Sequence, residues 1–134
     1  MTKANILVVE DNKHDTLLIK KLFSNSRIKN STKYANNISS AREIINTTNF
    51  DLAFIDIVLP DGSGLDVAEL LGGLQPHCAV VILSGTKETD TVMRAKEIGV
   101  ETFVAKPLDL PLLQETIKPF ENLHWFIGVD KVAS

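Results

Sequence analysis

The sequence predicts an α/β fold, an open and doubly wound sheet of five parallel strands with helices on both faces. Short apolar runs, typical of buried strands, alternate along the chain with segments of helical periodicity. Strands that alternate with helices in this way favour a parallel sheet that is covered by helices. The length of 134 residues and the hydrophobic fraction of 44% match one domain with one proper core.

The first half of the chain contains two predicted strands and two predicted helices. Residues 6–9 (ILVV) are the first strand, and residues 13–24 are a helix with an apolar stripe and lysines near its C-terminal end. A polar loop leads to a short, weak strand at residues 32–36. Ser40 and Glu43 have the spacing of a capping box, so they predict the start of the second helix.

The middle of the chain contains the most strand-like segments. Residues 51–56 (DLAFID) are predicted to be a buried strand, which the turn Pro60-Asp61-Gly62 follows. Residues 64–72 predict a helix that Gly72-Gly73 ends, and residues 79–83 (AVVIL) predict the next strand.

The last third repeats the alternation. Residues 87–98 predict a helix that ends at Gly99, a favourable C-terminal glycine. Residues 102–105 predict the fifth strand, and residues 109–118 begin a final helix that Pro119 should end or kink.

Charged and polar residues stand at the ends of these predicted strands. Glu10 and Asp11 follow the first strand, Asp56 ends the third, and Ser84 and Lys106 follow the fourth and fifth. In doubly wound sheets, ligands bind at the carboxyl ends of the strands. Three negative carboxylates, one positive lysine and one Mg²⁺ ion would together carry almost no net charge. Mg²⁺ is the expected ion because it prefers hard oxygen ligands such as carboxylates. Phosphoryl transfer needs such charge neutralisation, and an aspartate can itself be the nucleophile.

Composition excludes several classes of protein. A net charge of −3 gives no support to a nucleic-acid surface. The single cysteine, Cys78, cannot form an intrachain disulfide, and no apolar stretch approaches the length of a membrane span. The N-terminus carries no signal-peptide pattern, so we expect a cytoplasmic protein. The histidines lack metal-ligand spacing, which argues against a histidine zinc site.

The chain resembles the response-regulator receiver domains of two-component signalling. The matching segments are 6–12 (ILVVEDN), 51–65 (DLAFIDIVLPDGSGL), 81–85 (VILSG) and 99–107 (GVETFVAKP). They occur in the family's order and spacing over residues 5 to about 118. The resemblance implies a flavodoxin-like (βα)5 fold with strand order 2-1-3-4-5. It also implies a receiver domain at residues 1–120 and an extension or linker at 121–134.

The resemblance implies a role for each matching residue. Asp56 would be the phosphoacceptor, and Glu10, Asp11, Asp56 and the backbone carbonyl of Val58 would hold Mg²⁺.

Further roles follow for residues near the ends of the fourth and fifth strands. Lys106 and Ser84 would contact the phosphoryl group, and Phe103 would be an aromatic switch residue. Pro107 would follow Lys106 in a cis peptide bond, which is uncommon even before proline. Lys13, His14 and Asp15, which begin the first helix, lie near the predicted site and could touch it.

The implied function is that of a signalling switch rather than a metabolic enzyme. The phosphoryl donor would be a histidine kinase or a histidine phosphotransfer protein, and the domain would catalyse its own phosphorylation and dephosphorylation. Phosphorylation would change the interactions with an output domain or protein, and could produce a dimer. No direct binding of nucleic acid or membrane is expected.

Three alternatives stay open on the sequence. One is a receiver-fold scaffold or interaction module that acts independently of phosphorylation. Another is a hydrolase with an aspartate nucleophile, although such phosphatases usually have a second acid where this chain has Val58. The third is a nucleotide-binding domain, although neither glycine-rich phosphate loop is present.

Overall fold

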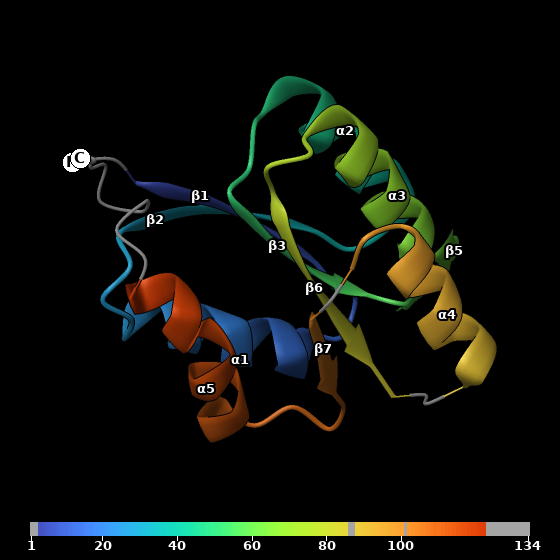
Figure 1. Cartoon of the computed structure of the whole chain (residues 1–134). Helices are drawn as coiled ribbons and strands as arrows, with labels where there is room; N and C mark the ends of the chain where they lie inside the picture. Colours follow the sequence, from blue (N-terminus) through green and yellow to red (C-terminus); the bar gives the residue numbers. More distant parts are fainter. Residues whose placement is uncertain (1–2, 86–87, 101, 123–134) are drawn as a thin grey trace.

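A five-stranded parallel sheet lies at the centre of the computed structural model, which describes residues 3–85, 88–100 and 102–122 (Figure 1). Its strand order is β2-β1-β3-β6-β7, so the predicted order 2-1-3-4-5 is confirmed once β6 and β7 are counted as the fourth and fifth strands. The strands are β1 (Ala4–Val9), β2 (Asn30–Ala35), β3 (Leu52–Asp56), β6 (Ala79–Ser84) and β7 (Thr102–Ala105).

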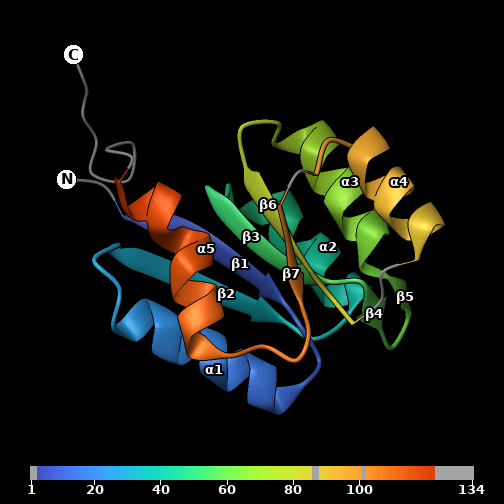
Figure 2. The same ribbon diagram turned by 60° about the horizontal axis from the view of Figure 1, so that its bottom comes forward.

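Five helices cover the two faces of the sheet (Figures 1 and 2). Helices α1 (Lys13–Ser24) and α5 (Leu110–Asn122) lie on one face, and α2 (Ile38–Thr47), α3 (Gly64–Leu74) and α4 (Thr89–Glu97) lie on the other. The side chains of β1 alternate between the two layers. Ile6 and Val8 pack in the cluster that α1 and α5 cover, and Leu7 and Val9 pack in the cluster beneath α2, α3 and α4.

Helix α2 does not begin with the predicted capping box. Its N-cap is Asn37, whose side-chain oxygen accepts a hydrogen bond from the Ser40 backbone N–H at 2.8 Å. The carboxylate of Asp61 accepts two further hydrogen bonds, from Ile38 N at 2.8 Å and from Ser39 N at 3.2 Å. The pairing of Ser40 with Glu43 was therefore wrong, because an asparagine and a residue far along the chain satisfy the free amides of this helix.

The predicted end of helix α3 was also wrong. Helix α3 continues through Gly72 and Gly73 to Leu74. Each glycine costs only about 1 kcal/mol relative to alanine, and the fully buried Leu71 secures the same turn against the core.

Helix α5 continues past Pro119 to Asn122. Phe120 packs against the core beyond the proline. The carboxylate of Glu121 accepts hydrogen bonds from the Ser26 hydroxyl at 3.0 Å and from Arg27 N at 3.2 Å. These contacts stabilise the last turn although the proline has removed a helical hydrogen bond.

Two features of the chain match their sequence signals. Gly99 has a φ of 94° and follows the end of α4, and its N–H donates to Lys96 O at 3.0 Å. The Pro60-Asp61-Gly62 segment joins two short antiparallel strands, β4 (Val58–Leu59) and β5 (Gly62–Ser63). Gly62 adopts a φ of 143°, which glycine accommodates without strain.

The parallel register brings the strand ends that carry the predicted site residues to one edge of the sheet. Asp56 at the end of β3 is opposite Leu83 of β6, and Ser84 is opposite Ala105 of β7.

The helices in the described part of the chain are all too short or too polar to cross a membrane. The predicted boundary between a domain at 1–120 and an extension at 121–134 stays a prediction, since residues 123–134 lie outside the described ranges.

Candidate functional site

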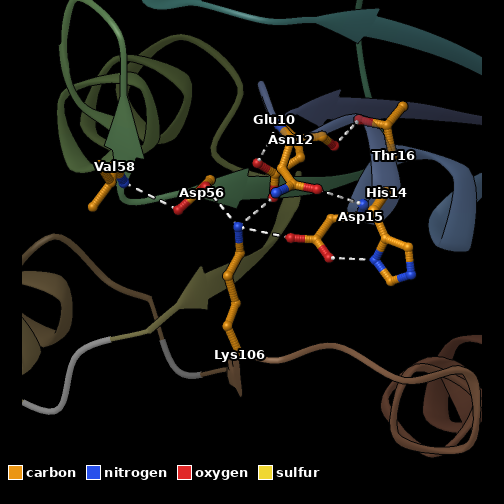
Figure 3. A network of polar contacts seen from close by, with 8 residues as sticks. All are labelled: Glu10, Asn12, His14, Asp15, Thr16, Asp56, Val58 and Lys106. Atoms are coloured by element: carbon orange, nitrogen blue, oxygen red, sulfur yellow. Dashed lines mark hydrogen bonds and ion pairs between the residues drawn. The ribbon is translucent and has the colours of Figure 1, made fainter.

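Asp56 is a buried carboxylate at the carboxyl end of the central strand β3. Only 5% of the residue is exposed. Its Oδ1 accepts a hydrogen bond from Val58 N at 3.0 Å, and its Oδ2 lies 2.8 Å from Lys106 Nζ (Figure 3). An ionised carboxylate can be buried when it is paired in this way.

The backbone at the start of α3 lies very close to the backbone at the end of β3. The N–H of Gly64, at the start of α3, donates to Ile57 O at 2.7 Å. A Cβ atom on Gly64 would lie 1.8 Å from the backbone oxygen of Asp56, so only glycine fits there. Gly64 therefore holds α3 against the strand that presents Asp56.

Glu10 and Asp11 complete an acidic cluster with Asp56. Each of the three offers a carboxylate oxygen within 4.8 Å of the other two. Glu10 is 4% exposed and Asp11 is exposed. Glu10 Oε2 accepts a hydrogen bond from Asn12 N at 3.1 Å, and its buried Oε1 lies within ion-pair distance of Lys106 Nζ. Three carboxylates that can each offer an oxygen to one point form the kind of donor set that a hard divalent cation prefers.

Lys106 supplies the positive charge at this edge. Its Nζ lies 2.8 Å from Glu10 Oε1, 2.8 Å from Asp56 Oδ2 and 3.0 Å from Asp15 Oδ2 (Figure 3). Burial alone would lower the pKa of this lysine, but hydrogen bonds to Asp56, Glu10 and Asp15 outweigh burial and raise the pKa above its usual range. Lys106 is therefore a permanent cation.

The pKa of Glu10 is raised from its usual 4.5 to about 7. Burial is the largest cause, and Asp56 raises the pKa further, while hydrogen bonds from Lys106 and Asn12 lower it. Without a cation in the cluster, Glu10 therefore holds a proton for part of the time near neutral pH.

Asp15 joins the site more closely than its position in the sequence revealed. It lies in the first turn of α1 and is 7% exposed. Its N–H donates to the N-cap side chain of Asn12 at 3.0 Å, and its Oδ1 lies 3.5 Å from His14 Nδ1. The sequence placed Asp15 near the site only because it begins the first helix, shortly after Glu10 and Asp11. Its position does not show that the Asp15 side chain points toward Lys106 and that its neighbours do not.

The remaining predicted residues lie around this cluster. Ser84 is 7% exposed at the end of β6, and its carbonyl accepts a hydrogen bond from Lys106 N at 2.8 Å. Phe103 is partly buried against the core beneath α2, α3 and α4. The peptide bond between Lys106 and Pro107 is cis. Val58, beside the site, is 70% exposed.

A doubly wound parallel sheet with a buried aspartate, an acidic pair and a lysine at its carboxyl edge is the arrangement of an aspartyl phosphoacceptor domain. The family model described as "Response regulator receiver domain" matches residues 6–118. The chain belongs to this family, whose members are the phosphoacceptors of two-component signal transduction.

Two relatives differ in how much of their own length matches this chain. It is 32% identical over 117 residues to the response regulator protein PilR of Pseudomonas aeruginosa. The aligned region covers 87% of this chain and 26% of PilR. It is 25% identical over 120 residues to sporulation initiation phosphotransferase F of Bacillus subtilis, with 90% of this chain and 95% of that protein covered. The chain thus spans about a quarter of PilR and nearly all of the Bacillus protein.

Solved structures agree on the fold. A CheY-like response regulator receiver domain protein from Methanospirillum hungatei has a TM-score of 0.81 at 22% identity, over 95% of this chain and all of that one. A response regulator protein from Burkholderia pseudomallei has a TM-score of 0.75 at 23% identity, over 89% of this chain and 69% of that one. The second structure contains a phosphorylated aspartic acid, a calcium ion and citrate.

Proposed function

We propose that Asp56 is the residue that accepts the phosphoryl group. The observation that carries this assignment is the placement of its buried carboxylate 2.8 Å from Lys106 Nζ, beside the carboxylates of Glu10 and Asp11. Among the acids of this cluster, Asp56 ends the central strand, where the carboxyl edge of the sheet opens to a ligand. The phosphorylated aspartic acid of the Burkholderia structure supports the same chemistry.

Mg²⁺ is the cation that we propose for the acidic cluster. Glu10, Asp11 and Asp56 would hold it together with the backbone carbonyl of Val58, since Mg²⁺ takes carboxylate and carbonyl oxygens and retains several waters. When bound, it neutralises charge on the phosphoryl oxygens during transfer. The calcium ion in the Burkholderia structure supports a divalent cation in this family.

The transfer itself is a displacement at phosphorus. A carboxylate oxygen of Asp56 attacks the phosphorus of a phosphohistidine, a bond between oxygen and phosphorus forms, and the bond between phosphorus and the imidazole nitrogen breaks. The electron pair of the broken bond stays on the imidazole nitrogen. Lys106 Nζ, already 2.8 Å from Asp56 Oδ2, is placed to pair with a phosphoryl oxygen as charge is transferred. Water can later attack the same phosphorus, which breaks the bond between the Asp56 oxygen and phosphorus, releases inorganic phosphate and restores the carboxylate.

We also propose a donor of the phosphoryl group and the residues that respond to phosphorylation. The donor would be a histidine kinase or a histidine phosphotransfer protein. The readout would involve Ser84 and Phe103, which lie on neighbouring strands β6 and β7. Ser84 would bind the phosphoryl group, and Phe103 would repack as Ser84 moves. The surface near β7 would then bind an output domain, an output protein or a second copy of the chain. The domain would act as a switch with intrinsic phosphorylation and dephosphorylation activity.

Phosphoryl incorporation from a small-molecule phosphodonor with Mg²⁺ tests the assignment. We expect the intact mass of the wild-type chain to increase by one phosphoryl group, and Asp56→Asn to abolish this gain. Asp61→Asn is the matched control, because Asp61 is a nearby exposed carboxylate that only caps α2. Equal incorporation by Asp56→Asn and the wild type would show that another residue is the acceptor. No incorporation by the wild type would favour a scaffold that acts without phosphorylation.

A further inference from the structure

Three carboxylates share Lys106, and one of them has no part in the proposed chemistry. Asp56 would accept the phosphoryl group and Glu10 would hold the cation, whereas Asp15 belongs to neither role. Its Oδ2 nevertheless lies 3.0 Å from Lys106 Nζ, and its side chain is only 10% exposed (Figure 3). A charged side chain is rarely this buried unless it is paired.

Hydrogen bonds hold Asp15 in place from the same loop that carries the acidic pair. Asn12 N donates to Glu10 Oε2 at 3.1 Å, and Asn12 Oδ1 accepts from Asp15 N at 3.0 Å. The hydroxyl of Thr16 donates to Asn12 O at 3.0 Å. The first turn of α1 is thus tied to Glu10, which places the Asp15 carboxylate beside the lysine.

The three partners of Lys106 change differently when the site is used. Phosphorylation converts one oxygen of Asp56 into an acyl phosphate oxygen, and a cation in the cluster draws on the oxygens of Glu10. Asp15 takes part in neither the transfer nor the binding of the cation, so its oxygens remain available to Lys106 in both states. It is therefore the carboxylate of the three that can hold Lys106 before and after transfer.

We propose that Asp15 is a positioning residue that keeps the Lys106 ammonium group at the site throughout the phosphorylation cycle. This inference rests on the proposed function of the same site. Without Asp15, the ammonium group would be shared by Glu10 and Asp56 alone, so it would compete more strongly with the cation for their oxygens. It would also lose an anchor once Asp56 carries the phosphoryl group.

The test compares phosphoryl incorporation in five versions of the 134-residue chain at saturating Mg²⁺. They are the wild type, Asp15→Asn, Lys106→Gln, the double variant of these two, and Asp90→Asn. Asp90 is the control because it is an exposed acid in the first turn of α4, so its substitution reports on a helix N-terminus alone.

We expect Asp15→Asn to slow incorporation about five- to tenfold, the effect of replacing a charge-assisted hydrogen bond at the reacting site with a neutral one. Asp90→Asn should leave the rate unchanged. In the Lys106→Gln background, Asp15→Asn should change the rate less than about twofold, because both residues act as one unit. An equal slowing in both backgrounds would overturn the proposal, since Asp15 would then act without Lys106. A wild-type rate for Asp15→Asn would also overturn it.

A second readout needs no phosphorylation. Side-chain NMR of the Lys106 Cε and Nζ groups should show a well-ordered ammonium group in the wild type and increased mobility in Asp15→Asn, with no change in Asp90→Asn. Unchanged order in Asp15→Asn would contradict the proposal. If Asp56 were not the acceptor, incorporation would fail to depend on Asp56 while this NMR difference remained, so the two failures are distinguishable.

Discussion

Replacing Lys106 with methionine should destabilise the metal-free protein far more than losing an ordinary surface ion pair. The side chains of its partners Glu10, Asp15 and Asp56 are 0%, 10% and 7% exposed, and Lys106 itself is 20% exposed. Removing one partner of a buried ion pair costs about 3–5 kcal/mol, because the other charge stays buried without compensation. Glu10, whose pKa is already about 7, can relieve part of this cost by taking up a proton. We therefore expect a loss of about 3 kcal/mol at neutral pH.

The matched control is Lys118→Met. Lys118 Nζ lies 2.8 Å from Glu115 Oε1, the same distance as in the buried pairs, but the two side chains are 59% and 68% exposed. Such a pair contributes little to stability, because water screens both charges. Urea unfolding in the presence of a chelator measures both losses, and saturating Mg²⁺ should restore part of the stability of the Lys106 variant. Equal losses in the two variants would refute the argument from burial.

Three further predictions concern the cation, the backbone and the thiol. Mg²⁺ should bind more weakly as the pH falls below 7, by up to about tenfold per pH unit, because the ion must displace the proton that Glu10 holds through its raised pKa. Calorimetric titrations would contradict this if they gave the same Mg²⁺ affinity from about pH 8 to about pH 5.5. Gly64→Ala should cost about 3 kcal/mol and reduce phosphorylation, because its Cβ would lie 1.8 Å from Asp56 O. Gly73→Ala is the control, because a Cβ atom there, in the last turn of α3, meets nothing within 4 Å; it should stabilise the protein by up to about 1 kcal/mol. Equal unfolding midpoints for the two variants would count against the close approach. Cys78 should resist iodoacetamide near pH 8 until urea unfolds the chain, because burial, and next the nearby charge of Asp51, raise the thiol pKa to about 12; rapid alkylation of the folded protein would contradict this.

Stability without metal should also depend on pH through Glu10. Its pKa is higher in the folded protein than its usual value of 4.5, so the folded state binds more protons than the unfolded state between about pH 4.5 and about pH 7. The contribution of this group to the free energy of unfolding therefore falls as the pH rises through that range. Bound cation should remove this dependence, because it replaces the proton as the counter-charge of Glu10.

The sequence predicted the parts of the fold that local pattern determines. The apolar runs became the sheet strands, and the helix at Lys13–Ser24 has the predicted bounds. The acidic pair, Asp56 and Lys106 were predictable as neighbours because parallel strands bring their carboxyl ends to one edge. Chain order and the right-handed crossover of βαβ units then leave few other arrangements.

The features that the sequence did not predict depend on contacts between distant segments. Asp61 caps α2 across 23 residues of chain, which a search for a local capping box could not find. Helix α5 passes Pro119 because Glu121 accepts hydrogen bonds from a segment near α1. Asp15 contacts Lys106, which follows the last strand of the sheet and is far from Asp15 along the chain. In each case a tertiary contact outweighed a local propensity.

Chemical localisation of the phosphoryl group tests the central claim most directly. The wild-type chain is treated with a small-molecule phosphodonor and Mg²⁺, reduced with borohydride to convert an acyl phosphate into an alcohol, and digested for tandem mass spectrometry. We expect homoserine at position 56 and unmodified residues at positions 10, 11 and 15. Reduction at any of those three positions, with aspartate intact at position 56, would contradict it.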